Sequence, residues 1–557
     1  MSLHRLILLV LLFPSAAMCA WTEPKALTNT SGSALNGCMV VSDYGEIYFF
    51  WDDIRNGSGQ IFFRKRPCSE ITFGSAQALS PVTSQARNPG ASCGKIIVAV
   101  WEDDRNGTWQ IFWRKSTDAG LSWTREQSLS SASAASFHPA VATSGDGIYV
   151  AWVDSVSGTI RFRSSSDAGI SWTSEETLNN TGVDYPAMAS AADNVYLVFQ
   201  EDMGGSTEIV YRSRNSLNAW SGSFILSGTN VSRPAISAGE NSVNVAWLQD
   251  NRVSARCSSN QGNAWQSEQT ISGNISGTAS SESITTGKSG KVYIAWLDNR
   301  DGSNKVYMTE TSGENVWSQV RMICDSSSIS FVSIGIFGFN LHLCIKSQDQ
   351  FFYRMCDETS PVITMLASPT HPDGKSAGNN DPVFRWQAQD DSGGCGIAGY
   401  NYCFDMSAGT IPAQQMIYPP DFSEADFPGT ASGTWYFHVR AVDNLGNWSA
   451  PAVFKVEIQN ECLLPSEQVW CQPNPVRNDF PCIHYFLRKG ASVAIEFFNE
   501  AGEKITEFQE HGKAGINIFT GLNAGSWVNG AYLFRVKADD SETGENAETV
   551  KTMVLVR

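Results

Sequence analysis

Five residues of different chemistry occupy the same place in successive repeats of this chain. Each enters the first strand of its repeat, and proline follows four of them. The pairs are Asn88-Pro89, His138-Pro139, Tyr185-Pro186, Arg233-Pro234 and Glu282-Ser283. An amide, an imidazole, a phenol, a guanidinium and a carboxylate supply donors, acceptors, an aromatic face and both charges. Because the proline recurs while the residue before it changes, we predict that these five side chains form a ligand-binding site.

The same five positions also fit a set of solvated loop residues, and the sequence leaves that alternative open. For chemistry, Tyr185 is a nucleophile type, Glu282 an acid or base type, and Arg233 a carboxylate-binding type. These three residues are the candidates if the chain is an enzyme. Their pattern completes no reaction, so we assign no catalytic residue and expect a binding protein rather than an enzyme.

A second repeated motif places an arginine in each of three hairpins. It reads Trp51-Asp-Asp53-Ile-Arg55-Asn-Gly57, Trp101-Glu-Asp103-Asp-Arg105-Asn-Gly107 and Trp296-Leu-Asp298-Asn-Arg300-Asp-Gly302. The Asn-Gly and Asp-Gly steps are typical of tight hairpins, and each Asp can orient its own Arg by charge and hydrogen bonding. A catalytic set breaks the symmetry of a repeat, and this motif obeys it. We therefore interpret it as a loop brace rather than a three-arginine clamp on a carboxylate.

The elements that position these residues are short strands in repeats of about 50 residues. Aromatic strand ends recur at Trp51, Trp101, Trp152, Phe199, Trp247 and Trp296, with a fainter copy near Leu343. Each repeat has four alternating or apolar segments separated by turns, which predicts a four-stranded propeller blade. Residues 21–27 resemble the outer strand of later repeats, and residues 329–357 supply only three strands. We predict that the two segments share one blade, giving seven blades, or six if residues 329–357 form none.

An eight-residue turn leads into the outer strand of two repeats. It reads Ser116-Thr-Asp118-Ala-Gly120-Leu-Ser-Trp123 and Ser165-Ser-Asp167-Ala-Gly169-Ile-Ser-Trp172. The Asp accepts backbone hydrogen bonds, the Gly takes a positive φ, and the Trp wedges between sheets. Strand direction places these turns at the opposite end of the blades from the five candidate residues. The turns are therefore predicted to be structural.

These turns resemble the Asp boxes of sialidase-like (BNR-repeat) propellers. The resemblance implies a sialidase-superfamily fold and carbohydrate as a ligand class. Sialidases use a Tyr nucleophile beside a Glu, an acid/base Asp, three clamping arginines and an Arg-Ile-Pro motif. This chain has no Arg-Ile-Pro, and Arg233-Pro234 is only a partial echo in the fifth repeat. The match supports the fold and leaves sialidase activity in doubt.

Two further β-sandwich domains are expected after the propeller. Residues 358–460 resemble a fibronectin-III or Ig-like module, on the evidence of Gly433 to Ser449 and Asp390 to Tyr400. Residues 461–557 are similar to the C-terminal Ig-like domains of exported bacterial proteins, of the flagellar hook-capping and type IX sorting kinds. The matching segments are Pro473-Asn-Pro475, Ser492 to Gly502, Asn529 to Val536 and Lys551 to Arg557. This resemblance implies secretion or surface attachment.

The composition favours an exported protein. Residues 1–20 resemble a signal peptide, with His4 and Arg5 before the apolar run Leu6 to Phe13. Cys19 raises a lipoprotein alternative, against which the bulky Met18 argues. The net charge of -17 disfavours nucleic acid and anionic membrane as partners, and no later segment is long enough to span a bilayer.

The remaining cysteines are even in number, so disulfides are expected between Cys395 and Cys403 and within the set Cys462, Cys471 and Cys482. No spacing indicates a metal site, and no cofactor is expected. The sequence thus predicts an all-β, secreted or cell-surface recognition protein for a glycan or an extracellular protein. An exo-sialidase-like glycoside hydrolase and a purely structural surface protein are the alternatives, and the oligomeric state stays open.

Overall fold

The computed structural model describes residues 21–28, 34–68, 70–178, 182–215, 218–273, 277–312, 316–326, 328–371, 373, 376–377, 379–458, 463–477, 480–541 and 544–556. The all-β prediction is confirmed, since the one helical turn in these ranges is Ser466–Gln468. None of the described segments forms a helix with the length and apolarity needed to cross a bilayer. The expected export signal, residues 1–20, lies outside the described residues.

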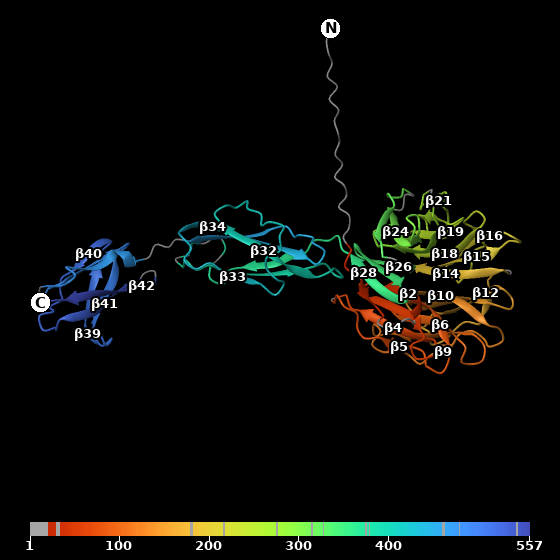
Figure 1. Cartoon of the computed structure of the whole chain (residues 1–557), viewed down its shortest axis with the longest axis horizontal. Helices are drawn as coiled ribbons and strands as arrows, with labels where there is room; N and C mark the ends of the chain where they lie inside the picture. Colours follow the sequence, from red (N-terminus) through yellow and green to blue (C-terminus); the bar gives the residue numbers. More distant parts are fainter. Residues whose placement is uncertain are drawn as a thin grey trace, which may run out of the picture. The chain divides into compact units, whose positions relative to one another are not determined.

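Seven four-stranded antiparallel sheets follow one another in the described part of residues 21–357 (Figure 1). The first three are β2 (Ala34–Val41), β3 (Ile47–Asp53), β4 (Gln60–Arg66), β5 (Gln77–Ala78); β6 (Ala86–Cys93), β7 (Ile97–Asp103), β8 (Gln110–Ser116), β9 (Gln127–Ser128); and β10 (Ser136–Ser144), β11 (Gly147–Asp154), β12 (Thr159–Ser165), β13 (Glu176–Thr177). The next three are β14 (Val183–Ala191), β15 (Asn194–Asp202), β16 (Thr207–Arg214), β17 (Phe224–Ile225); β18 (Val231–Ala238), β19 (Val243–Gln249), β20 (Arg252–Ser258), β21 (Gln269–Thr270); and β22 (Ala279–Thr286), β23 (Val292–Asp298), β24 (Lys305–Thr311), β25 (Arg321–Cys324).

The seventh sheet joins the two ends of this region. Its strands β26 (Ile329–Phe337), β27 (Asn340–Ser347) and β28 (Gln350–Cys356) are completed by β1 (Lys25–Ala26). Lys25 pairs with Tyr353, and Trp21 forms a further bridge with Cys356. The prediction that residues 21–27 complete the last blade is confirmed, and this pairing covers the free edge of β28.

The sheets are arranged as a closed ring. The first strand of each sheet contacts the first strand of the next, and β26 contacts β2. The second strands are buried on both faces, as in Ile97–Asp103, because a neighbouring sheet covers each side. Trp51, Trp101, Trp247 and Trp296 are among the fully buried side chains of these strands. The repeated aromatic strand ends therefore form the contacts between blades of a β-propeller.

Strand register separates the two ends of each blade. In the second sheet, Ala86 at the start of β6 pairs with Asp103 at the end of β7. Ser116, which opens the Asp-box turn, pairs with Ile97 at the start of β7. The entry to the first strand and the β7–β8 hairpin thus share one end of the blade, as predicted, and the Asp box lies at the other.

The described chain divides into two compact units. One comprises Met1–Val362 with the segments Gln389–Ala398 and Ala441–Ser449, and the other comprises Ile363–Ala388, Gly399–Arg440 and Ala450–Arg557. Two further pairs of sheets follow the propeller strands in the sequence. In the first pair, one sheet has the strands β29 (Val362–Ala367), β31 (Val383–Gln389) and β33 (Glu424–Asp426), and the other has β30 (Ser376–Ala377), β35 (Ala452–Ile458), β34 (Gly433–Asp443) and β32 (Ile397–Asp405). In the second pair, one sheet has β36 (Val469–Gln472), β37 (Cys482–Leu487) and β40 (Gly515–Phe519), and the other has β39 (Lys504–Gly512), β38 (Ala491–Phe498), β41 (Gly530–Asp540) and β42 (Glu545–Leu555).

Each pair of sheets has its own core. Phe384 of β31 stacks on Phe437 of β34, with ring centroids 4.4 Å apart. In the last pair, Ile483 and Tyr485 of β37 belong to the same buried cluster as Val493 of β38. Alternating residues of two sheets thus build each interior, as in a β-sandwich. The fibronectin-III and sorting-domain assignments stay predictions.

The predicted disulfides are wrong. Cys395, Cys403, Cys471 and Cys482 are all free thiols, and Cys462 lies outside the described residues. Cys395 belongs to the unit that contains the propeller, while Cys403 belongs to the other unit. Cys471 pairs with Ile483 and Gln472 pairs with Cys482, so the two cysteines are one position out of register. Their side chains therefore point to opposite faces of the sheet.

Candidate binding site at the channel mouth

All five predicted site residues line a single cavity of about 530 Å³. Asn88, His138, Tyr185, Arg233 and Glu282 come from the first strands of five consecutive sheets. Asn36 of β2 and Phe331 of β26 complete the wall, so every sheet of the ring contributes. The cavity therefore surrounds the propeller axis at the end where the first strands begin.

A β-bulge places each of these side chains. The pairing of β10 with β11 shifts between Phe137 and Ala140, and equivalent shifts occur at the start of every first strand. Within the bulges, φ is +52° at Asn88, +51° at His138, +47° at Tyr185 and +51° at Arg233. A bulge and a left-handed residue re-aim the side chain out of the strand's usual alternation. The following proline cannot donate to the ladder, which suits a bulge.

The sixth repeat departs from the predicted alignment. The register shift there falls between Ser280 and Glu282, and Ser281 has the φ of +50°. Ser281 is therefore the equivalent of His138 or Arg233, and Glu282 takes the place of the proline. The prediction placed the equivalent residue one position too late, at Glu282, because this repeat has no proline to mark the bulge. Glu282 nevertheless lines the cavity.

Three neighbouring residues form a continuous layered wall. The His138 ring stacks on the Tyr185 ring with centroids 4.9 Å apart and planes 16° apart. The Arg233 guanidinium lies over the Tyr185 ring, 5.5 Å from the ring centroid. Stacking and cation–π attraction hold the three planes together without using the polar edge of Arg233. Within the described residues, the guanidinium of Arg233 makes no hydrogen bond or ion pair, and Arg233 lines the cavity.

Glu282 is the unsatisfied acid of the site. Its Oε2 atom is buried and has no hydrogen-bond partner among the described residues. Burial raises the pKa of Glu282 to about 8, and the charge of Arg233 opposes part of that rise. At neutral pH the carboxyl group is therefore largely protonated, and it does not cancel the positive charge of Arg233. The cavity wall is then cationic around Arg233.

Acidic side chains that the sequence analysis did not single out support the cavity from behind. Asp184 accepts a hydrogen bond from Nδ1 of His138 at 2.5 Å and another from the Tyr185 backbone N–H at 2.9 Å. The hydrogen bond to Asp184 raises the pKa of His138, and it lowers that of Asp184. The pair therefore fixes the His138 ring in the wall. Asp184 stands directly before Tyr185 in the sequence, but only the fold brings it to His138.

Two buried acids hold the bulges of the early blades. Glu102 accepts hydrogen bonds from the Asn88 side-chain amide and from the His138 backbone N–H, both at 2.9 Å. Asp52 accepts a hydrogen bond from Nδ2 of Asn36 at 2.9 Å and another from the Asn88 backbone N–H at 3.2 Å. Each acid thus links the bulges of two successive blades. Both residues lie inside the repeated Trp-Asp-Asp and Trp-Glu-Asp motifs, which is the signal that marks them.

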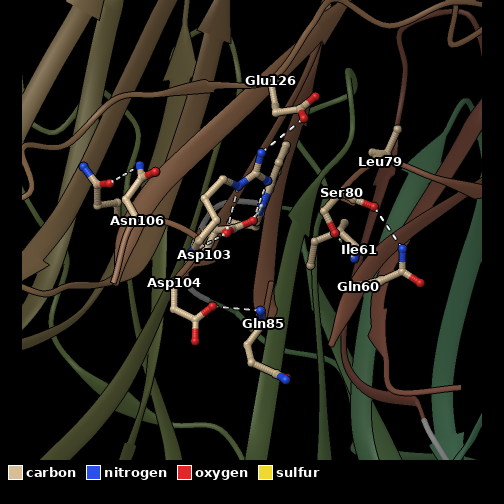
Figure 2. Close-up of polar contacts among 12 residues, drawn as sticks. Gln60, Ile61, Leu79, Ser80, Gln85, Asp103, Asp104, Asn106 and Glu126 are labelled. Atoms are coloured by element: carbon tan, nitrogen blue, oxygen red, sulfur yellow. Dashed lines mark hydrogen bonds and ion pairs between the residues drawn. The ribbon is translucent and has the colours of Figure 1, made fainter. Parts of the chain in front are cut away.

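The three hairpin arginines are held away from the cavity. Arg105 donates to both carboxylate oxygens of Asp103, from Nε at 2.9 Å and from Nη2 at 2.6 Å, and its guanidinium lies 4.2 Å from the Phe112 centroid. Figure 2 shows Asp103 together with Glu126. Glu126 accepts a further hydrogen bond from Arg105 at 3.1 Å. Figure 2 also shows Asp104, which accepts from the Gln85 backbone N–H at 2.8 Å.

Arg55 and Arg300 repeat this arrangement with Asp53 and Asp298. The Arg300 guanidinium lies 4.3 Å from the Tyr307 centroid. The side chains of all three aspartates are fully buried. This geometry supports the interpretation of the motif as a brace, because each guanidinium pairs with the aspartate of its own hairpin. Arg300 also donates to the Ser272 carbonyl of the preceding sheet at 3.2 Å.

The Asp-box turns make contacts between adjacent sheets. Asp118 Oδ1 accepts hydrogen bonds from the Ser116 hydroxyl at 2.8 Å and from the Ser122 backbone N–H at 2.9 Å. The Ser122 hydroxyl also donates to Asp118, and this bond together with the other two lowers the pKa of Asp118 to about 2. Trp123 packs edge-on against Phe63 of the preceding sheet, with centroids 5.1 Å apart.

The second box has the same construction. Asp167 accepts hydrogen bonds from the Ser165 hydroxyl and the Ser171 backbone N–H, at 2.7 and 2.9 Å. Trp172 packs against Trp113 of the preceding sheet at 4.9 Å. Gly120 and Gly169 both have a φ of +79°. Each box residue thus has a structural task, at the end of the blades away from the cavity.

The three catalytic candidates line one cavity but do not form a catalytic pair. No hydrogen bond joins the Tyr185 hydroxyl to Glu282 in the described structure, since Oε2 of Glu282 has no partner. An activated nucleophile has a base within hydrogen-bond reach. Tyr185 instead presents its ring to His138 and Arg233.

Comparison with family models gives no match, and comparison with curated proteins gives none either. Among solved structures, the chain is similar to the Trypanosoma rangeli sialidase in complex with the inhibitor DANA, with a TM-score of 0.35 and 13% identity over 69% of this chain and 86% of that one. It is also similar to a protein of unknown function from Dyadobacter fermentans, with a TM-score of 0.38 and 11% identity over 60% and 99% of the two chains.

A third similar structure is the subtype N10 neuraminidase-like protein of A/little yellow-shouldered bat/Guatemala/060/2010. Its TM-score is 0.35, with 7% identity over 50% of this chain and 95% of that one. At these scores and identities, the three likenesses add no evidence on function.

Proposed function

We propose that this chain is an exported recognition protein that binds a glycan through the channel-mouth cavity. The observation that carries the proposal is Arg233, whose guanidinium is stacked on Tyr185 and keeps its hydrogen-bond donors free at the cavity. A stacked cation of this kind is ready to bind hydroxyl or carboxylate oxygens without first breaking an internal bond.

The cavity's size and lining support a glycan. A volume of about 530 Å³ lies within the range of small-ligand pockets and fits the end of a sugar chain better than a protein surface. The His138 and Tyr185 rings offer apolar faces, and Asn88 and Arg233 add polar groups beside them. An apolar face with polar groups at its rim matches the two-sided chemistry of a sugar ring.

The cationic wall favours a glycan with an acidic group. Glu282 is largely protonated at neutral pH, and Asp184 is engaged with His138, so neither carboxylate neutralises Arg233 by a direct ion pair. Binding of an acidic sugar is therefore expected to weaken above about pH 8, where Glu282 ionises next to Arg233.

The test is a glycan array probed with the purified chain and its variants, followed by calorimetry on the best ligand. Arg233→Ala and His138→Ala are each expected to weaken binding at least tenfold, because a charge-assisted hydrogen bond is worth about 1.5–3 kcal/mol. The control is Arg125→Ala, an exposed arginine in the Asp-box region, which should bind like the wild type.

Two results would overturn the proposal. If no glycan on the array binds, or if Arg233→Ala binds as well as wild type, the channel mouth is not the site and a structural role gains support. If the wild-type chain releases the fluorophore from a fluorogenic sialoside and Tyr185→Phe abolishes that release, the chain is a sialidase-type hydrolase instead.

A further inference from the structure

A cluster of acidic side chains lies at one end of the last propeller sheet. Carboxylate oxygens of Asp357, Asp390 and Asp443, together with the Cys395 thiol, all lie within 4.8 Å of one another. Asp357 follows β28, and Asp390 and Cys395 belong to the loop Asp390-Asp-Ser-Gly-Gly-Cys395. These residues all belong to the compact unit that contains the propeller. The fold thus concentrates three carboxylates from distant parts of the sequence into one small volume.

No cation of the described chain balances these charges. No Lys or Arg nitrogen in the described ranges forms an ion pair with Asp357, Asp390 or Asp443. The buried Arg66 donates to the Tyr353 hydroxyl at 3.0 Å and to the Gly393 carbonyl at 3.3 Å instead. The cluster is therefore electrostatically unfavourable as it stands.

A buried amide and a fourth carboxylate lie beside the cluster, and each has one oxygen without a hydrogen-bond partner among the described residues. Asn340 is fully buried and donates from Nδ2 to Asp391 Oδ2 at 2.8 Å, while its Oδ1 has no partner. Asp391 Oδ1 is likewise buried and without a partner. Buried oxygens without donors are rare, and a bound ion or water would supply their missing partners.

Oxygens of two carboxylates converge beside Gly394. A Cβ atom added at Gly394 would lie 2.6 Å from both Asp390 Oδ2 and Asp391 Oδ1. The two oxygens therefore lie on the same side of Gly394, close enough to its backbone that no larger side chain fits there. Backbone N–H groups hold the surrounding acids in place, since Gly396 donates to Asp390 at 2.6 Å and Cys395 donates to Asp357 at 2.8 Å. Each of these oxygens keeps a second lone pair for another ligand.

We propose that this acidic loop binds one calcium ion. Calcium takes carboxylate and amide oxygens at 2.3–2.6 Å, so oxygens on opposite sides of one ion lie about 4.8 Å apart. The ligand atoms of the cluster all lie within 4.8 Å of one another, so they fit inside that span. The donor set has three carboxylates and one thiol, and oxygen-rich sets of this kind suit calcium better than zinc.

The proposed ion would join three chain segments of one compact unit. Asp357 extends from the last propeller strand, Asp390 and Asp391 come from Gln389–Ala398, and Asp443 begins the turn within Ala441–Ser449. Binding the ion would replace mutual repulsion with shared coordination. Calcium is therefore expected to stabilise the folded chain by mass action.

The test is calcium titration of the full chain after treatment with EGTA, followed by calorimetry and by the melting temperature. Wild type is expected to bind one calcium per chain and to melt several degrees higher with calcium. Asp390→Asn should bind calcium at least tenfold more weakly, yet melt in EGTA no lower than wild type, because it removes one repelling charge. The exposed Asp421→Asn is the matched control and should behave as wild type in both measurements.

The wild-type titration decides the proposal even if the variant fails to fold. The absence of both calcium heat and a calcium-dependent melting shift at millimolar calcium would overturn it. So would equal affinity in folded Asp390→Asn and wild type, or a site that takes zinc in preference to calcium. None of these outcomes depends on glycan binding, so the two proposals fail separately.

Discussion

At the scale of single residues, two side chains of the cavity have polar atoms without hydrogen-bond partners among the described residues. Arg233 stacks on Tyr185 and keeps its donors free, while Glu282 has a buried oxygen without a partner. A half-buried acid with a desolvated oxygen of this kind costs stability when it ionises, which is a common feature of sites shaped for a ligand. The pH dependence of stability therefore reports on Glu282.

Glu282→Gln should flatten the fall in stability between pH 4.5 and pH 8. The folded-state pKa of Glu282 is raised to about 8 from 4.5. Between these values the unfolded chain loses the proton and the folded chain keeps it, so the free energy of unfolding decreases as pH rises. Below pH 4.5 both states are protonated and this contribution is constant.

We expect the wild type to lose roughly 1–3 kcal/mol more than Glu282→Gln over this interval. The measurement is chemical denaturation followed by tryptophan fluorescence at pH 4.5, 6 and 8. Glu240→Gln, an exposed acid, serves as the control and should follow the wild-type profile. Parallel profiles for wild type and Glu282→Gln would show that Glu282 is not a neutral buried acid.

At the scale of elements, each blade carries a bulge at one end and, in two blades, an Asp box at the other. The box depends on glycine for two separate reasons. Gly169 has a φ of +79°, and a Cβ there would lie 2.3 Å from Cη2 of Trp113 in the preceding sheet. Gly107, in the β7–β8 hairpin, has a similar φ of +83° but nothing within 4 Å of an added Cβ.

Gly169→Ala is therefore expected to destabilise the propeller by roughly 2–4 kcal/mol, from backbone strain and overpacking together. Gly107→Ala should cost only about 1 kcal/mol, since it carries the backbone term alone. Denaturant midpoints of the two variants, measured side by side, give the comparison. Equal losses would mean that the contact between the box and Trp113 contributes nothing.

The elements also show what could be predicted from the sequence. The bulge residues of four blades were predictable because a proline marks each one, and Glu282 was misplaced by one position because its repeat has no proline. The roles of Asp184 and Glu102 could not be predicted, because each depends on contacts with a neighbouring blade that the sequence of a single repeat does not reveal. The disulfide between Cys395 and Cys403 was wrong because Cys395 precedes β32 and Cys403 lies near its end, so an extended strand holds the two thiols apart.

At the scale of the whole molecule, the closed ring determines where the cavity and the Asp boxes lie. Closure by β1 on β28 leaves the propeller with two distinct ends, one with the bulges and the cavity and the other with the Asp boxes. The repeat period and the outer-strand match of residues 21–27 were enough to predict this closure. The acidic cluster was not predictable, since its members meet only after Asp357, Asp390 and Asp443 are folded together.

The most direct test of the account is hydrogen–deuterium exchange of the full chain with and without its best-binding glycan. If the channel mouth binds the glycan, we expect ligand-dependent protection at the starts of β6, β10, β14 and β18, near Asn88, His138, Tyr185 and Arg233. We expect no change in the Asp-box turns at 116–123 and 165–172. Protection of those turns, with none at the four strand starts, would contradict the assignment of the channel mouth as the binding site.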